Sequence, residues 1–227
     1  MSPSGETLRE RRRRETRDEI HAAALRLARG RGFDKITVDM ISAESGVSAR
    51  TFFNYFPSKE DAIVLGPAVL PRAVVREFAA LGPAHPRDVL ADLTRALVAD
   101  IAAHGPRREE MQAIFLLTHD HPTVLAAMLT RFDQFQRSVA EAVAERLGQR
   151  PEDEVPSMVA ALALAAVRVG LERWTADDSP ERDDSAVPYV ERSADLLHTL
   201  LTPRDAAGPR AVRLATHPMT RTRRPDE

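Results

Sequence analysis

Apolar residues recur at helical spacing along most of the chain, and alternation typical of strands does not stand out. Near the start, four apolar residues occupy positions i, i+3, i+4 and i+7, the spacing of one helix face: Ile20, Ala23, Ala24 and Leu27. Gly30 and Gly32 follow and end this helix. The pattern therefore predicts an all-α protein.

Hydroxyl side chains precede three further helices. Thr37 can cap a short helix, and after a tight turn at Ser45-Gly46, Ser48 can cap a helix from Ala49 to Tyr55. Ser58, followed by Asp61, begins a capping box that opens a fourth helix. We expect this fourth helix to continue into the body of the protein.

Prolines and glycines divide the remaining chain. Pro67 and Pro71 kink or delay the fourth helix. Later breaks predict helices near 87–103, 107–120, 123–147, 152–176 and 187–201, with an acidic loop at 177–186. The tail from Thr202 holds four prolines and six arginines, with little apolar periodicity, and is predicted to be disordered.

Residues 37–56 predict a helix-turn-helix. Ile41, Val47, Phe52 and Phe56 are spaced to pack against the first helix. The second short helix then presents outward a set of side chains suited to base edges in a major groove, namely Ala49, Arg50, Thr51, Phe53 and Asn54. An ordinary helical hairpin with a polar face is the alternative interpretation.

Charge is unevenly divided along the chain, although the net charge is only −2. Residues 1–66 hold 12 Lys and Arg against 10 Asp and Glu, whereas residues 67–201 hold 14 against 21. An acidic body behind a less acidic front fits DNA contact at one end, although solvated faces give the same pattern. Cysteine is absent, which excludes disulfides and thiolate metal sites. We expect a cytoplasmic protein without a membrane span.

The segment from Arg14 to Ile63 resembles the TetR family of bacterial repressors. The resemblance is carried by Gly46-Val47-Ser48, Thr51-Phe52-Phe53, the run from Tyr55 to Glu60, and the run from Gly32-Phe33 to Thr37-Val38. Ser42 and Ser45 replace the usual alanine, and Phe53 replaces a common tyrosine. The resemblance implies that Tyr55 and Lys59 contact phosphates, and that Thr37 contacts the DNA backbone. Ser48, as the cap of the second short helix, joins this surface.

The predicted domains are a helix-turn-helix domain at 14–66 and a ligand-binding and dimerisation domain of helices at 67–201. Residues 1–13 form a basic arm and 202–227 the tail. The arginines Arg11 to Arg14 precede the first helix, and Arg12, Arg13 and Arg14 are candidates for a minor-groove contact. A solvated, flexible basic segment is the alternative.

The stretch from Met158 to Val167 is apolar on all faces and must be covered on all sides. With the helix near 188–201 it is predicted to form a two-fold, four-helix dimer interface, since two recognition helices roughly 34 Å apart match a palindromic operator. The candidate residues are Met158, Ala161, Leu162, Ala165, Leu196, Leu197 and Leu200. A helix buried within one subunit is the alternative.

Residues 133–174 also resemble the C-terminal domain of mycofactocin-type regulators, a TetR subgroup with acyl-CoA-like ligands. Phe132-Asp133, the run from Ala144 to Gly148, Pro151-Glu152-Asp153 and the Ala-rich helix through Leu171 to Trp174 carry this resemblance. It implies an apolar or amphipathic effector. Candidate pocket residues are Phe78, Leu97, Ile101, Met111, Phe115, His119, Met128, Phe132, Phe135 and Trp174, although such a stripe also suits a plain core.

No sequence pattern supports catalysis, a cofactor or a metal. His119 and His121 stand at i and i+2, point in different directions on a helix, and lack a strong third ligand nearby. The leading hypothesis is a homodimeric repressor that a small ligand releases from double-stranded DNA through movement of the fourth helix. A TetR-type activator or pleiotropic regulator without a ligand, a lipid carrier or enzyme with an added helix-turn-helix, and a nucleoid-coating protein are the alternatives.

Overall fold

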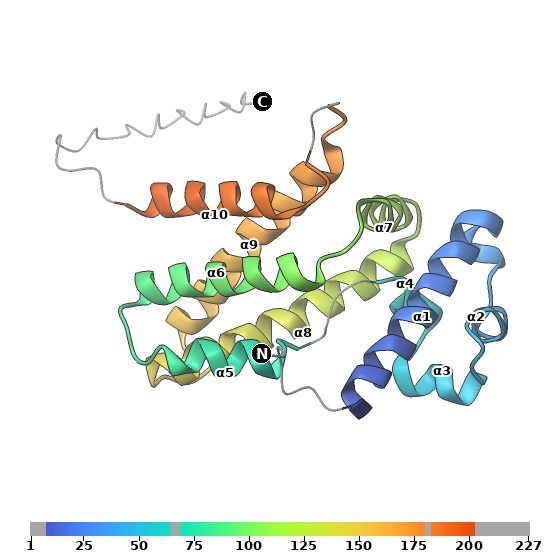
Figure 1. Ribbon diagram of the computed structural model, residues 1–227, viewed down its shortest axis with the longest axis horizontal. Coiled ribbons are helices and arrows are strands. Elements are labelled where there is room, and N and C mark those ends of the chain that lie inside the picture. The colour runs from blue at the N-terminus through green and yellow to red at the C-terminus, as the bar shows by residue number, and fades with distance from the viewer. Residues whose placement is uncertain (1–7, 65–68, 180–182, 203–227) are drawn as a thin grey trace, which may run out of the picture.

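The N-terminal helices form a small unit of their own (Figure 1). The computed structural model describes residues 8–64, 69–179 and 183–202, and all regular elements within these ranges are helical. The unit consists of α1 (Leu8–Arg31), a 3₁₀ turn η1 (Phe33–Lys35), α2 (Val38–Glu44), α3 (Ala49–Tyr55) and α4 (Lys59–Ile63). Its core holds Ile20, Ala24, Ile41, Phe52 and Phe56, all nearly inaccessible to solvent.

Six further helices form the body. They are α5 (Arg72–Ala80), α6 (Pro86–His104), α7 (Arg108–Asp120), α8 (Pro122–Leu147), α9 (Glu154–Ala176) and α10 (Val187–Leu201). α9 packs against α6, α8 and α10 (Figure 1). Gly170 lets α9 approach the backbone of α10 at Val190 closely, since a Cβ built on Gly170 would lie 2.6 Å from the Val190 Cα.

The predicted helix boundaries in the body are confirmed to within a residue or two, as are α2 and α3. Two expectations at the N-terminal end are wrong. Arg11 to Arg14 lie inside α1, which begins at Leu8, so they are no arm ahead of a helix. α4 ends at Ile63 after five residues and does not itself continue into the body. The predicted tail from 203 onward lies outside the described residues.

The small unit and the body share one core. Ala113 and Ile114 of α7 and Val124 of α8 are buried in the same apolar cluster as Phe33 and Ile36. The His121 ring, between α7 and α8, lies 4.9 Å from the Phe33 ring. α4 also packs against α8, and α1 against α7 (Figure 1). This small N-terminal unit of α1 to α4, called the recognition unit below, is therefore held directly by the N-terminal half of α8 and by α7.

By length and composition alone, α9 could cross a membrane, with a mean hydropathy of 1.6 over its most apolar window. Core helices of soluble proteins pass the same test. Contacts with α6, α7, α8 and α10 cover part of its apolar surface, and Met158 and Val169 stay exposed at 53% and 38%.

Candidate DNA-binding surface and helical body

Side-chain caps define where the two short helices of the motif begin. The Thr37 hydroxyl accepts a hydrogen bond from the Met40 amide at 3.3 Å, and the Ser48 hydroxyl accepts one from the Thr51 amide at 3.1 Å. Gly46 has a φ of 70°, a left-handed conformation that glycine adopts without strain. These are the caps and the turn that the sequence predicts, and they give α3 a defined start.

α3 is anchored by one face and leaves the other open. Phe52 and Phe56 are fully buried, while Arg50, Phe53 and Asn54 are exposed. Phe53 is 57% exposed and stands edge-on to Phe52, with ring centroids 5.5 Å apart. An exposed aromatic ring held between two polar side chains can contact a thymine methyl while Arg and Asn donate to neighbouring bases.

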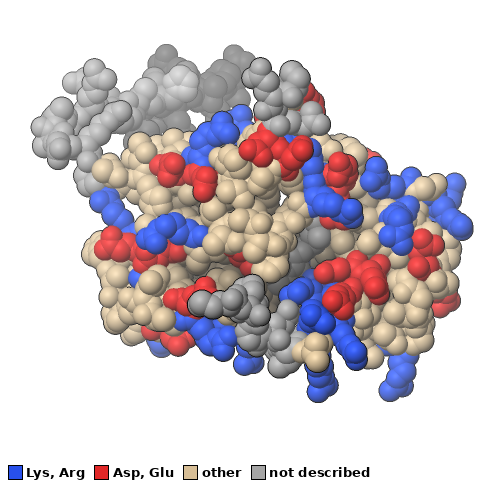
Figure 2. Space-filling view, in the orientation of Figure 1, with Lys and Arg blue, Asp and Glu red and all other residues tan. Residues whose placement is uncertain are grey.

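The remaining predicted DNA-binding side chains have other local contacts. The Thr51 hydroxyl is hydrogen-bonded to that of Ser48 at 2.9 Å, and Ala49 and Tyr55 are half-buried. Thr37 is exposed at the start of α2. In the space-filling view, Lys and Arg side chains project from the end formed by α1, α2 and α3, with acidic side chains among them (Figure 2).

Lys59 has a structural role in addition to any contact with a ligand. Its ammonium donates hydrogen bonds to the carbonyl oxygens of Phe33 and Ile36, both at 3.1 Å. It also lies 4.4 Å from the centre of the Phe33 ring. An ammonium has three donors, so one remains for a phosphate at the start of α4. Sequence reasoning treated this lysine as a phosphate contact alone, because no local pattern links it to residues 23 and 26 positions earlier.

The basic residues of α1 are displayed on a helix. Arg12 and Arg13 are exposed, and Arg11 lies 3.6 Å from Glu15 in an i,i+4 ion pair. Successive arginines on a helix point in directions about 100° apart. They therefore cannot all enter one minor groove, as a flexible arm could, and only those on one side can meet a DNA backbone.

Seven of the ten predicted pocket residues fall into two separate clusters. Ile101, Met111, Phe115 and Trp174 lie together, where α6, α7 and α9 meet. The second cluster is the larger core of the body, which contains Phe78, Leu97 and Phe135. Met128 is half-buried, Phe132 is 37% exposed, and His119 is exposed at the end of α7. The structure does not bring the ten candidates to one site.

A buried arginine that sequence reasoning missed ties the smaller of these clusters together. Arg108 donates to the carbonyl oxygens of Trp174, Asp177 and Asp183, and its guanidinium lies 4.9 Å from the Trp174 ring. The hydrogen bond from the Tyr189 hydroxyl lowers the pKa of Asp177 to about 2. The indole Nε1 of Trp174 is buried without a hydrogen-bond partner. An apolar cluster with an unsatisfied donor can accept a ligand carrying an oxygen acceptor.

His21 of α1 is a buried polar group in the recognition unit. Its Nδ1 donates to the carbonyl oxygen of Ala62 at 2.8 Å, which links α1 to α4, and its Nε2 has no partner. Burial lowers the pKa of His21 below its ordinary value of 6.5. A neutral histidine at this position is therefore part of the stable fold.

The predicted dimer residues lie on α9 and α10, where several are exposed, while Leu162 and Leu197 pack against the larger core of the body. Met158, Leu196 and Leu200 are 53%, 58% and 73% exposed, and Ala165 is also exposed. Ala161, Leu162 and Leu197 are half-buried. The structure adds Val169 and Leu201, exposed at 38% and 41%. Exposed leucine and methionine side chains on two neighbouring helices are typical of an interface between subunits.

Two family comparisons cover most of the chain. Residues 20–63 match the family described as "Bacterial regulatory proteins, tetR family". Residues 87–202, just over half of the chain, match the "MftR C-terminal domain" family of TetR regulators. The chain belongs to the TetR family. It is thus a transcriptional regulator with a helix-turn-helix DNA-binding domain and a ligand-binding C-terminal domain.

Two named relatives of this TetR-family protein align over most of their length. The HTH-type transcriptional regulator TcmR of Streptomyces glaucescens is 29% identical over 179 residues, 76% of this chain and 79% of TcmR. MftR of Mycobacterium tuberculosis, whose name assigns it to mycofactocin biosynthesis, is 28% identical over 173 residues, 74% of this chain and 84% of MftR. Among solved structures, Thermus thermophilus FadR in complex with lauroyl-CoA is 27% identical, with a TM-score of 0.47 over 85% of this chain and 98% of FadR.

Proposed function

We propose that this regulator is a homodimeric repressor that acts in the cytoplasm and binds a palindromic operator through α3 of both subunits. The observation that supports this most directly is the anchoring of α3. The buried side chains of Phe52 and Phe56 anchor one face of the helix. The opposite face exposes Arg50, Phe53 and Asn54 to solvent. A rigid helix with this exposed face suits base readout in a major groove.

The dimer part of the proposal depends on α9 and α10. Both helices carry exposed apolar side chains, among them Met158, Val169, Leu196 and Leu200, and a two-fold axis at this surface would pair each helix with its copy. Dimerisation matches the two half-sites of an operator, whose centres lie roughly 34 Å apart. A charge placed in this surface would break the dimer.

The release part depends on the cluster around Trp174. We propose a small apolar or amphipathic effector, with an acyl-CoA as the first candidate, whose oxygen acceptor meets the free indole Nε1. Met111 and Trp174 are buried, so the effector reaches them only when α7 moves away from α9. Because α7 also shares a core with the recognition unit, this movement shifts α3.

The first experiment selects binding sites from a pool of random DNA duplexes, using the full chain. We expect an enriched palindrome bound by two protomers. Leu196→Asp should yield a monomer by sedimentation and lose operator binding, because it places a carboxylate within the proposed dimer interface. Leu116→Asp is the matched control, since Leu116 is 66% exposed on α7. A wild-type monomer, or an asymmetric site bound by one protomer, would contradict the proposal.

The second experiment titrates the protein–operator complex with lauroyl-CoA, with free coenzyme A as the control. We expect the acyl-CoA to release the DNA and to be recovered unchanged. Trp174→Phe keeps the aromatic ring and removes the indole N–H, so it should weaken the response while leaving operator affinity unchanged. An equal response in Trp174→Phe would exclude this cluster as the effector site.

A further inference from the structure

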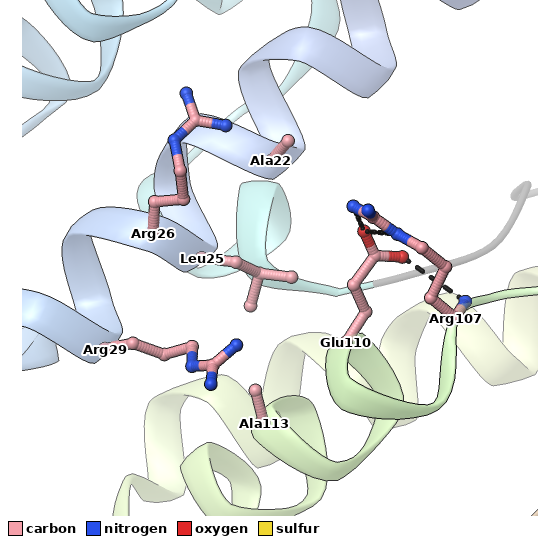
Figure 3. Close-up of a pocket in the computed structure, with 7 residues that line it drawn as sticks. All are labelled: Ala22, Leu25, Arg26, Arg29, Arg107, Glu110 and Ala113. Atoms are coloured by element: carbon pink, nitrogen blue, oxygen red, sulfur yellow. Dashed lines mark hydrogen bonds and ion pairs between the residues drawn. The ribbon is translucent and has the colours of Figure 1, made fainter.

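The recognition unit meets the body on two sides, and the contacts on these sides differ. On one side α1 faces α7 across a cleft of about 260 Å³ (Figure 3). Two ion pairs lie at this cleft. Arg107 pairs with Glu110 within α7, and Arg26 pairs with Glu44 within the recognition unit. Neither pair bridges the two parts, so neither sets the angle between the recognition unit and the body.

An ion pair does bridge the other side, where α4 packs against α8 (Figure 1). The guanidinium of Arg131 on α8 lies 3.8 Å from the carboxylate of Asp61 on α4. The two side chains are only 13% and 21% exposed, so the pair is screened less than pairs on the open surface. Apolar packing is not directional, whereas this charged contact favours one placement of α4 on α8.

The Asp61 carboxylate is held in place by the cap of α4. The Ser58 hydroxyl donates to one carboxylate oxygen at 2.6 Å and accepts from the Asp61 amide at 3.1 Å. The other carboxylate oxygen is the one that faces Arg131. Residues 56–58 alone separate α3 from α4, and Phe56 among them is fully buried. A contact at the start of α4 therefore acts on α3 through a short, packed connection.

Arg17 of α1 brings a second guanidinium to this side. It lies 5.4 Å from the centre of the Phe56 ring, and burial, together with the nearby charge of Arg131, lowers the pKa of Arg17. The recognition unit and the body thus each place a positive charge here. Asp61 supplies a negative charge next to Arg131, and without it the like charges would favour a wider separation of the two parts.

We propose that Arg131 is a positioning residue for operator binding, and that its pair with Asp61 sets the spacing of the two α3 helices in the dimer. This inference rests on the homodimer and the palindromic operator proposed above. The proposed dimer surface belongs to the body, so the angle between body and recognition unit decides how far apart the two α3 helices lie. One base pair added between the half-sites moves one of them by roughly 3.4 Å and turns it by roughly 35°. The ion pair has to open for α3 to follow that shift.

The test uses the full chain and three DNA duplexes: the selected palindrome, the same palindrome with one base pair inserted at its centre, and a single half-site. The wild-type chain should prefer the palindrome over the inserted duplex by about 100-fold, because avidity is lost when the geometry prevents both subunits from binding. In Arg131→Met this preference should fall about five-fold, while affinity for the half-site stays unchanged. A merely structural role would instead lower affinity for all three duplexes alike.

Three further variants sharpen the test. Arg137→Met is the matched control, since Arg137 lies on the same helix, is 67% exposed, and pairs with Asp133 within α8. Arg131→Lys keeps the positive charge and should retain most of the spacing preference. Asp61→Asn keeps an acceptor for Ser58 but removes the charge, so it should reproduce the loss. The double variant Asp61→Asn with Arg131→Met should lose no more than the more affected single variant, because both changes remove one contact.

The outcomes separate this inference from the proposed function. Full spacing preference in Arg131→Met, additive losses in the double variant, or an equal loss in Arg137→Met would overturn the role of Arg131 and leave the proposed repressor intact. A loss of half-site affinity as large as the loss on the palindrome would also overturn positioning. If the wild-type chain bound all three duplexes equally, the palindromic operator would be wrong, and spacing control by Arg131 with it.

Discussion

Lys59 provides the sharpest test of how the recognition unit is held together. Lys59→Met keeps most of the aliphatic stem and removes the ammonium. The change deletes two hydrogen bonds of 3.1 Å, to the carbonyl oxygens of Phe33 and Ile36, and the contact with the Phe33 ring at 4.4 Å. Because the side chain is only half-buried, each hydrogen bond is assigned about 1 kcal/mol and the ring contact about 0.5 kcal/mol.

The expected loss in the free energy of unfolding is therefore about 2–3 kcal/mol. The assay is guanidinium chloride unfolding, followed by circular dichroism. Lys35→Met is the matched control, since Lys35 is the only other lysine of the chain and is exposed. It should change stability by less than about 0.5 kcal/mol. If Lys59→Met proves as stable as the control, the bonds to Phe33 and Ile36 contribute nothing and the reasoning fails.

The same variant tests the phosphate contact. Lys59→Met should weaken binding to all DNA sequences alike, measured where the variant is fully folded, and should reduce the slope of log K against log salt by about 1. An unchanged slope would leave Lys59 with its structural role alone. A loss confined to the preferred operator would contradict a phosphate contact.

Three other substitutions test separate parts of the structure. Arg50→Ala should relax preference at one base position, with a cost of about 1–3 kcal/mol on the preferred site only, measured by competition between operator variants; uniform weakening would instead assign Arg50 to the backbone. Gly170→Ala should lower stability by about 1–3 kcal/mol or more, because its Cβ would lie 2.6 Å from the Val190 Cα, whereas Gly30→Ala, with open space around its Cβ, should not. Stability should fall as the pH drops below 6.5, because the lowered pKa of His21 means that the unfolded chain takes up a proton that the folded chain refuses. His21→Gln should reduce this fall between pH 7.5 and 5.5, and an identical pH profile would exclude His21 as its source.

Much of the fold follows from local signals in the sequence. Thr37 and Ser48 fix the starts of α2 and α3 because a hydroxyl before a helix can accept from a free amide, a relation that spans three residues. Prolines at the starts of α6, α8 and α10 act in the same local way. Such signals require no knowledge of what the helix packs against.

The start of α1 could not be predicted from such local signals. The stretch around Arg11 to Arg14 has no apolar stripe, and its helix is supported by ion pairs such as Arg11 with Glu15. Hydrophobic periodicity does not detect a helix that is solvated on all sides. The early end of α4 has the opposite cause, since a capping signal at Ser58 indicates where a helix begins and not how far it extends.

The candidate sites also differ in how far local sequence signals predict them. Exposure on α3 is predictable, because Phe52 and Phe56 fix which face is buried. The pocket candidates were chosen for residue type, and type alone does not separate the Trp174 cluster from the core around Phe78. The hydrogen bonds from Arg108 to the carbonyl oxygens of Trp174 and Asp177 join residues 66 and 69 positions apart in the chain, and no spacing within α7 indicates these partners.

The shared core between the recognition unit and the body limits how this regulator can be recombined with its relatives. A chimera that grafts residues 1–66 onto another body leaves behind Ala113, Ile114 and Val124, which close the underside of the recognition unit. It also removes the His121 ring from the face of Phe33. A functional graft therefore has to carry the facing surfaces of α7 and α8, so operator choice is inherited together with part of the body.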